Sequence, residues 1–273
     1  MDLTTYLNAV ILGLVEGITE FLPISSTGHL IIAGNLLGFT GLRADTFEVF
    51  IQLGAILAVL WNYPERLAVL PRAWRGDAKA RGFILNLAVG VLPALVLGFL
   101  LHKTIKTYLF GPVTVAVALV VGGLFILWVE RRPYAGTIET VDQMSWRNAL
   151  SVGLAQCLAL MPGVSRAGAT IIGGMLLGLS RRAATEFSFF LAVPTMLAAT
   201  FYDLYKSRDA LVWSDLPLFA LGFVVSFISA LVVVRALLIF VGGHDFRSFA
   251  WYRILFGGLV LVYAWRFPGE FLS

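Results

Sequence analysis

The sequence predicts an all-α polytopic integral membrane protein built from two repeats of opposite topology. Of the 273 residues, 59% are hydrophobic and 13% are charged, whereas a soluble domain has roughly a quarter of its residues charged. The apolar residues also form runs close to the roughly 20 residues that cross a bilayer as a helix. The net charge of +4 is spread over separate loops, so we expect basic loops at a membrane surface and no nucleic-acid partner.

Six segments have the length and composition of membrane-spanning helices. In chain order they are residues 46–62, 83–101, 112–130, 184–204, 216–240 and 249–267. The last two segments contain Arg235 and Arg253, which we expect to be interfacial residues whose side chains extend to the membrane surface. The amino-terminal residues carry no basic segment, so we expect mature sequence there and not a signal peptide.

An internal repeat relates the two halves of the chain. Residues 13–39 (GLVEGITEFLPISSTGHLIIAGNLLGF) align without a gap with residues 153–179 (GLAQCLALMPGVSRAGATIIGGMLLGL), at an offset of 140. The same register continues into the next predicted span of each half. We therefore expect a single membrane domain, residues 1–273, with one repeat at about 1–130, a second at about 147–267, and a cytoplasmic loop at 131–146 between them.

Each repeat begins with a broken helix. An apolar helix is interrupted at Pro23 in the first repeat and at Pro162 and Gly163 in the second, and a second short apolar helix follows. Neither piece is long enough to span, and such breaks are tolerated at membrane depth only where protein or a cavity surrounds the freed backbone. The sequence thus predicts two re-entrant helix–loop–helix hairpins. Three spans follow each hairpin, so the second repeat must enter from the opposite side.

The loop charges favour one orientation. The loop of residues 62–82 carries five Lys or Arg residues; placing it in the cytoplasm puts eleven basic loop residues inside and six outside. The first hairpin then enters from the outer face and the second from the cytoplasmic face. Their tips are expected to approach each other.

The first hairpin contains an unusual concentration of polar side chains. Glu16 and Glu20 are four residues apart, so they share one face of a helix. Carboxylates inside a membrane domain are functional by default and could hold a hard divalent cation; they could also share a proton or pair with Arg166. His29 lies within reach of the tip. The tip follows Pro23 and offers hydroxyls, a small residue and free helix N–H groups, a combination suited to an anion. These candidate anion-binding residues are Ser25, Ser26, Thr27 and Gly28.

The second hairpin supplies a cation. Arg166 stands opposite Ser26 in the repeat alignment, and its planar guanidinium suits a phosphate or a carboxylate. Around it, the expected capping, close-approach and hydroxyl residues are Ser165, Gly168 and Thr170. Any one of these hydroxyls taken alone could simply bond a backbone carbonyl. Taken together, the two tips resemble a phosphoryl-transfer site, with an anion cradle, a cationic clamp, a nucleophile and an acid/base group.

Two segments carry a family resemblance. VEGITEFLPISSTGHL and PGVSRAGATIIGGMLLG strongly resemble the two signature segments of the undecaprenyl-diphosphate phosphatases of the BacA/UppP family, and TFEVFIQLGAILAV and EFSFFLAVPTM are similar to it as well. The resemblance extends over nearly the whole chain. One departure is Ala167, where the second motif of the family usually has a serine.

The resemblance implies an integral membrane hydrolase that converts undecaprenyl diphosphate to undecaprenyl phosphate. This reaction recycles the carrier lipid for peptidoglycan synthesis and is associated with bacitracin resistance. By matching positions, Ser26 is the proposed nucleophile and His29 the proposed acid/base or an alternative nucleophile, and a direct attack by water uses the same residues. The matched residues also include Glu16 and Glu20 as carboxylates for a divalent cation, commonly Mg²⁺ or Ca²⁺, with Ser165, Arg166 and Thr170 for phosphate.

The implied partners are a polyprenyl diphosphate lipid and membrane lipids, and a homodimer is compatible with the sequence. The implied location is the inner (plasma) membrane of a bacterium, with an active site open to the periplasmic or outer face. A rival class stays open, because inverted repeats with broken helices also describe secondary transporters. A transporter or flippase for an anionic lipid or a small anion would fit the same fold logic; a purely structural scaffold fits poorly, because it would not place such polarity at two hairpin tips.

Overall fold

The computed structural model describes residues 3–109, 111–132, 136–207 and 213–266. Within these ranges the chain is helical, and the β-structure is one isolated bridge between Ile138 and Leu179. The helices are α1 (Leu3–Thr19), α2 (Ser26–Leu36), α3 (Leu42–Asn62), α4 (Pro64–Leu67), α5 (Val69–Trp74), α6 (Ala78–Tyr108), α7 (Pro112–Glu130), η1 (Val141–Gln143), α8 (Trp146–Gln156), η2 (Cys157–Leu160), α9 (Arg166–Leu176), α10 (Arg181–Ser207), η4 (Trp213–Asp215), α11 (Leu216–Val241) and α12 (Arg247–Arg266).

Six helical segments of the described chain are long and apolar enough to cross a membrane, which confirms the predicted all-α class with six candidate spanning helices. They are Arg43–Asn62, Ala78–Leu101, Pro112–Glu130, Arg181–Lys206, Trp213–Val241 and Arg247–Arg266. Proline and aspartate mark several of their starts: Pro112 opens α7, and the Asp77 side chain caps α6 by accepting bonds from the Lys79 and Ala80 amides. Both residue types satisfy or remove the free N–H groups of a first helical turn.

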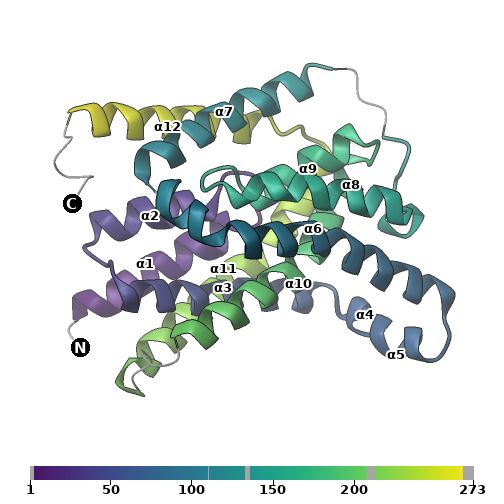
Figure 1. Ribbon diagram of the computed structural model, residues 1–273, viewed down its shortest axis with the longest axis horizontal. Coiled ribbons are helices and arrows are strands. Elements are labelled where there is room, and N and C mark those ends of the chain that lie inside the picture. Colours follow the sequence, from purple (N-terminus) through teal and green to yellow (C-terminus); the bar gives the residue numbers. More distant parts are fainter. Residues whose placement is uncertain (1–2, 110, 133–135, 208–212, 267–273) are drawn as a thin grey trace.

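Two helical hairpins lie between these long helices. α1 and α2 form the first, and α8, η2 and α9 form the second. Figure 1 shows them at opposite ends of the molecule, with their turns facing each other near its centre. The first helix of each hairpin packs on a long helix of the other repeat, α1 on α11 and α8 on α6. That these hairpins re-enter a bilayer stays a prediction, as does the division into repeats.

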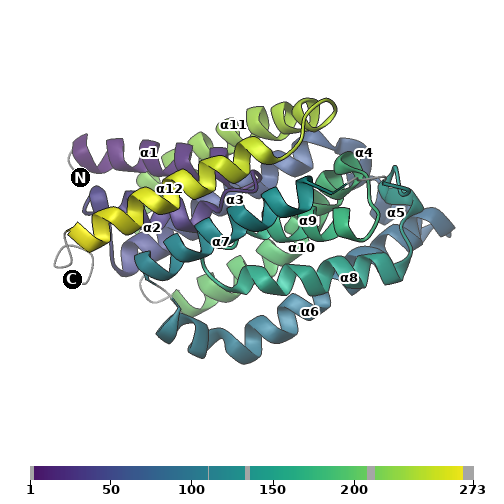
Figure 2. The same cartoon turned by 90° about the horizontal axis from the view of Figure 1, so that it is seen from above.

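The last long helices of the two repeats, α7 and α12, lie side by side in both views (Figures 1 and 2). Their ends are joined to α10 by Glu130, which is buried. Its carboxylate accepts bonds from Arg181 Nη2 at 2.5 Å and from the Phe246 amide at 2.9 Å. A second ion pair, between Arg66 of α4 and Asp142 of η1 at 2.9 Å, connects the segment after α3 with the segment between the two repeats. The basic loops that the sequence assigns to one side are therefore neighbours.

The main hydrophobic core surrounds the point where the hairpin turns meet. Phe21, in the first turn, packs edge-to-face on Phe189 of α10, with ring centroids 5.4 Å apart. Both rings are fully buried and belong to a cluster that includes Ala167 and Ile171 of α9. Because this packing joins residues of both repeats, it fixes the two turns against each other.

Candidate functional site

The two hairpin turns have the same local structure. Ser25 and Ser165, equivalent in the repeat, are the non-glycine residues of positive φ in the described chain, at 73° and 76°. Each caps the half-helix that follows it, because its hydroxyl accepts a bond from the Gly28 amide at 3.4 Å or from the Gly168 amide at 3.0 Å. Positive φ is costly for a residue with a side chain. Both hydroxyls therefore shape the turn, which is the capping role expected of Ser165, and phosphate binding by either serine stays a prediction.

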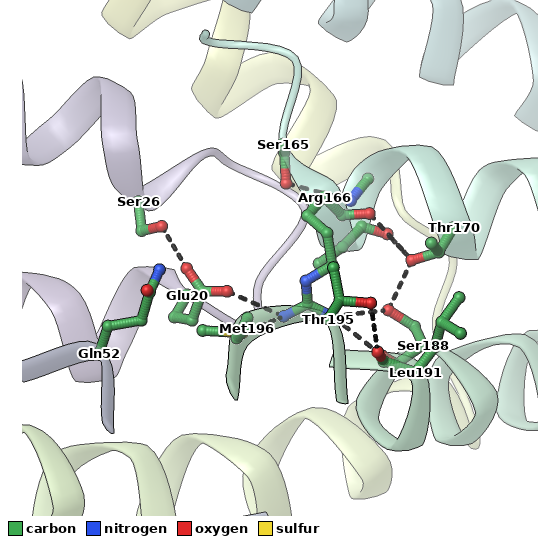
Figure 3. Close-up of polar contacts among 12 residues, drawn as sticks. Glu20, Ser26, Gln52, Ser165, Arg166, Thr170, Ser188, Leu191, Thr195 and Met196 are labelled. Carbon is green, nitrogen blue, oxygen red and sulfur yellow. Dashed lines mark hydrogen bonds and ion pairs between the residues drawn. The ribbon is translucent and has the colours of Figure 1, made fainter. Parts of the chain in front are cut away.

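Glu20 joins the two hairpins. It lies just after α1 and is buried. One carboxylate oxygen accepts a hydrogen bond from the Ser26 hydroxyl, and the other accepts one from Arg166 Nη2 at 2.9 Å. Figure 3 shows the resulting line of side chains from Ser26 through Glu20 to Arg166. The structure thus confirms that the tips meet, and it brings the hydroxyl, the carboxylate and the guanidinium into one group.

Arg166 is held in place by residues of α10. Its Nη1 donates to the Ser188 carbonyl at 2.9 Å and to the Ser188 hydroxyl at 3.3 Å. That hydroxyl lies 2.6 Å from the hydroxyl of Thr170, which is itself fully buried (Figure 3). Thr170 therefore orients the Ser188 hydroxyl, which in turn contacts Arg166. The Nε atom of Arg166 is buried and has no partner in the described part of the chain, so the guanidinium keeps one N–H for a further acceptor.

His29 faces away from this group. Its Nδ1 lies 2.7 Å from the Ser25 carbonyl, and its Nε2 lies 2.7 Å from the Tyr252 hydroxyl of α12. The ring is also stacked on Phe256, with centroids 4.4 Å apart. Both ring nitrogens therefore have partners other than Ser26. The structure brings Glu20, and not His29, to the Ser26 hydroxyl.

Glu16 is the carboxylate with free capacity. It is 1% exposed, and its Oε2 atom has no hydrogen-bond partner among the described residues. Among the described residues, no group of three or more His, Cys, Asp and Glu side chains is arranged to hold a metal ion. Magnesium, however, is commonly bound by one or two carboxylates together with substrate phosphates and water. The unpartnered oxygen of Glu16, beside Glu20, fits a hard cation bound in that way.

The remaining predicted site residues, Thr27, Gly28 and Gly168, differ in solvent exposure and in the residues they contact. Thr27 is exposed at the start of α2. Gly28 is buried, and a Cβ atom there would stand 3.0 Å from Val115 of α7. At Gly168, a Cβ atom would stand 3.2 Å from the guanidinium of Arg253. Both glycines allow the close approach of protein atoms that the sequence predicts, and phosphate binding at either glycine stays a prediction.

Sequence reasoning missed three residues at this centre: Ser188, Tyr252 and Arg253. Ser188 had a detectable signal, since the offset of 140 that defines the repeat places it opposite Glu48, one of the polar residues near the start of a predicted span. Arg253 was expected at the membrane surface, and that expectation was wrong. Its side chain is 1% exposed and lies between the two hairpin turns.

Known proteins resemble this chain over almost all of its length. A family model described as bacitracin resistance protein BacA matches residues 9–259. A protein named undecaprenyl-diphosphatase from Nitrosospira multiformis is 60% identical over 265 residues, which cover 97% of each chain. Proteins of the same name from Nitrosomonas europaea and Ectopseudomonas mendocina are 59% and 56% identical, covering 97% of this chain and 97% and 96% of their own.

Proposed function

This chain belongs to the BacA family, and we propose that it is a membrane-bound undecaprenyl-diphosphate phosphatase. It hydrolyses undecaprenyl diphosphate to undecaprenyl phosphate and inorganic phosphate, which returns the carrier lipid to cell-wall synthesis. Bacitracin resistance is an attribute of the family. The observation that carries the chemical side of the proposal is the Ser26–Glu20–Arg166 group, because a nucleophile, a proton acceptor and an anion clamp meet there.

Arg166 is the proposed clamp for the diphosphate. In the free enzyme its charge is paired with Glu20 at 2.9 Å. A diphosphate brought to the tips competes for the same guanidinium, whose unpartnered Nε offers an additional donor. As Arg166 turns to the phosphate, the Glu20 carboxylate loses part of its counter-charge and becomes a better proton acceptor. Substrate binding thereby prepares the base.

Ser26 is the proposed nucleophile, and Glu20 is its proposed base. The Ser26 oxygen attacks the terminal phosphorus while its proton passes to Glu20, to which it is already hydrogen-bonded. The bond from that phosphorus to the bridging oxygen breaks, and undecaprenyl phosphate leaves. Water then hydrolyses the phosphoserine, with Glu20 returning the proton to the Ser26 oxygen. The assignment of His29 as acid/base stays a prediction.

A divalent cation, Mg²⁺ or Ca²⁺, is the proposed cofactor, held by Glu16 and Glu20. Bound there, it would neutralise charge on the transferred phosphate. The free oxygen of Glu16 supports this assignment. Chelator should abolish phosphate release and added Mg²⁺ or Ca²⁺ should restore it, and Glu16→Gln should raise the cation concentration needed for half-restoration. Full activity in chelator would contradict the assignment.

We place the protein in the inner membrane of a bacterium, with the site open to the outer face. The ion pair between Arg66, which follows α3, and Asp142, which lies between the two repeats, supports placing these basic loops on one side of the membrane. The positive-inside rule assigns that side to the cytoplasm. The lipid tail of the substrate would lie between spanning helices, in contact with the bilayer. A homodimer stays a prediction.

The function is tested with purified protein in detergent, where no second compartment exists. Wild type should release phosphate from a polyprenyl diphosphate, and Ser26→Ala should lower the rate about a thousandfold or more while the protein stays folded. Ser229→Ala is the matched control, because the bonds of that hydroxyl within the described residues are to carbonyls of its own helix, α11. Binding of the lipid without phosphate release by wild type would favour a transporter or flippase. Near-normal turnover by Ser26→Ala would refute the nucleophile.

A further inference from the structure

Arg253 makes an unusual set of contacts at the centre of the molecule. The guanidinium of this α12 residue donates five hydrogen bonds, and every acceptor is a main-chain carbonyl oxygen. An arginine has five N–H donors, so each of them is used. The acceptors are Leu119 (3.2 Å, from Nε), Pro23 (3.0 Å) and Val164 (2.9 Å, both from Nη1), and Ala118 (3.2 Å) and Gly163 (3.0 Å, both from Nη2).

These acceptors belong to three separate segments. The Pro23 carbonyl lies in the break of the first hairpin, and the Gly163 and Val164 carbonyls lie in the break of the second. The other two acceptors, Ala118 and Leu119, lie in the interior of α7. One side chain therefore bonds both interrupted segments and the long helix beside them. A break frees backbone carbonyls that must find donors when they are buried.

Two glycines accommodate this guanidinium. A Cβ atom on Gly122 of α7 would overlap with Arg253 Nη2, and one on Gly168 of α9 would stand 3.2 Å from Nη1. A buried cation is costly, and its retention here without a carboxylate among its hydrogen-bond partners indicates that its geometry matters. Lysine cannot replace it, because an ammonium has three donors on one nitrogen and no planar fork.

We propose that Arg253 is a positioning residue for the reaction described above: it fixes the two hairpin turns in register, so that Ser26 and Glu20 of one stand at the right distance from Arg166 of the other. Arg253 itself contacts neither the nucleophile nor its base. It acts through the turn carbonyls, two residues before Ser25 and one or two residues before Ser165. This proposal rests on the proposed function for its kinetic effect, but its structural part is independent of it.

The kinetic test uses two variants that disturb the contact differently. Arg253→Lys keeps the charge and loses the five-donor geometry, whereas Gly122→Ala keeps the arginine and displaces it. Misplacement of reacting groups by about 1 Å can cost about a hundredfold, so we expect both variants to lose about that factor in kcat, with a smaller change in KM. Arg235→Lys and Gly258→Ala are the controls, because Arg235 is exposed and a Cβ on Gly258 meets open space. Both should keep wild-type kcat.

A distance measurement tests the same proposal without substrate. Leu36 and Leu176, equivalent in the repeat, are exposed at the far ends of α2 and α9. Each is replaced by cysteine and spin-labelled in a chain that also carries Cys157→Ala. The distance between the two labels then reports how the two hairpins are placed relative to each other. Wild type and both controls should give one narrow distance distribution, and Arg253→Lys and Gly122→Ala should give a broader or shifted one.

Folded variants with wild-type kcat and an unchanged distance distribution would overturn the proposal, even if they melted earlier. Failure of both to insert would make Arg253 a folding residue and would also overturn it. Absence of phosphate release by wild type, with the distances changed as expected, would refute only the proposed function.

Discussion

The two hairpins have one backbone and two chemistries. Ser25 and Ser165 share a positive φ, a capping bond and a position in the repeat. Around them, equivalent positions hold different groups: Ser26 corresponds to Arg166, and Glu20 to Leu160. The comparison teaches that the capping serines preserve a shape, while the reactive groups are the residues at which the two copies differ.

The difference between the two hairpins also explains why their charged groups can be buried together. Two copies of the first hairpin would duplicate Glu20 and Ser26, with no cation to neutralise a diphosphate. Two copies of the second would bring two guanidinium groups together, and their repulsion would be costly in a buried site. The observed Arg166–Glu20 pair, at 2.9 Å, uses one group from each.

The largest expected effect comes from removing the charge of Glu20. Glu20→Gln keeps the shape of the side chain, but it loses the proposed proton acceptor and the counter-charge of Arg166. We expect kcat to fall about a thousandfold, within the range for loss of a general base. Leu160→Met, at the equivalent position of the second hairpin, should leave kcat close to wild type. Comparable losses in the two variants would break the distinction between the hairpins.

An intermediate effect is expected at His29, whose counterpart is Ala169. Tyr252→Phe removes the hydroxyl bonded to His29 Nε2, and loss of such a hydrogen bond costs about 1 kcal/mol. We expect a loss of about fivefold to tenfold in kcat/KM for Tyr252→Phe and a similar one for His29→Gln. A loss for His29→Gln as large as that for Ser26→Ala would instead make the histidine the base of the nucleophile.

The smallest effect should be shared by both hairpins. Ser25→Ala and Ser165→Ala each remove one capping bond worth about 1 kcal/mol, so each should lower the melting temperature by about 2–4 °C. The corresponding glycine variants should lose less, because glycine tolerates positive φ. If glycine were as harmful as alanine at either position, the turn would not be the main role of that serine.

The sequence was sufficient for the long helices and for the meeting of the tips. Hydropathy located the six spans, and the offset between Gly13 and Gly153 revealed the repeat, from which the opposed hairpins followed. Glu20 and Arg166 were recognisable because ionisable side chains are rare in such helices, and Ser26 was recognisable because it lies in the polar tip after Pro23.

The contacts from other spans were not predictable from the sequence. Arg253 donates to main-chain carbonyls, which every residue type has, so the identity of its partner residues gives no sequence signal. Arginines in membrane helices also more commonly extend to the surface. Tyr252 lies far along the chain from His29, and its hydroxyl at a helix surface is typical of an interfacial tyrosine. Only the three-dimensional arrangement relates these residues to the tips.

The most direct test of a single site built from both hairpins is a double-mutant cycle on kcat/KM with Glu20→Asp and Arg166→Lys. These conservative changes leave measurable activity, and each disturbs the pair from one side. Because the two groups are in contact, we expect a coupling of at least about tenfold, or ~1.4 kcal/mol, so that the double variant loses much less than the product of the single losses. Losses that simply multiply would show that the two hairpins act independently, and the shared site would be contradicted.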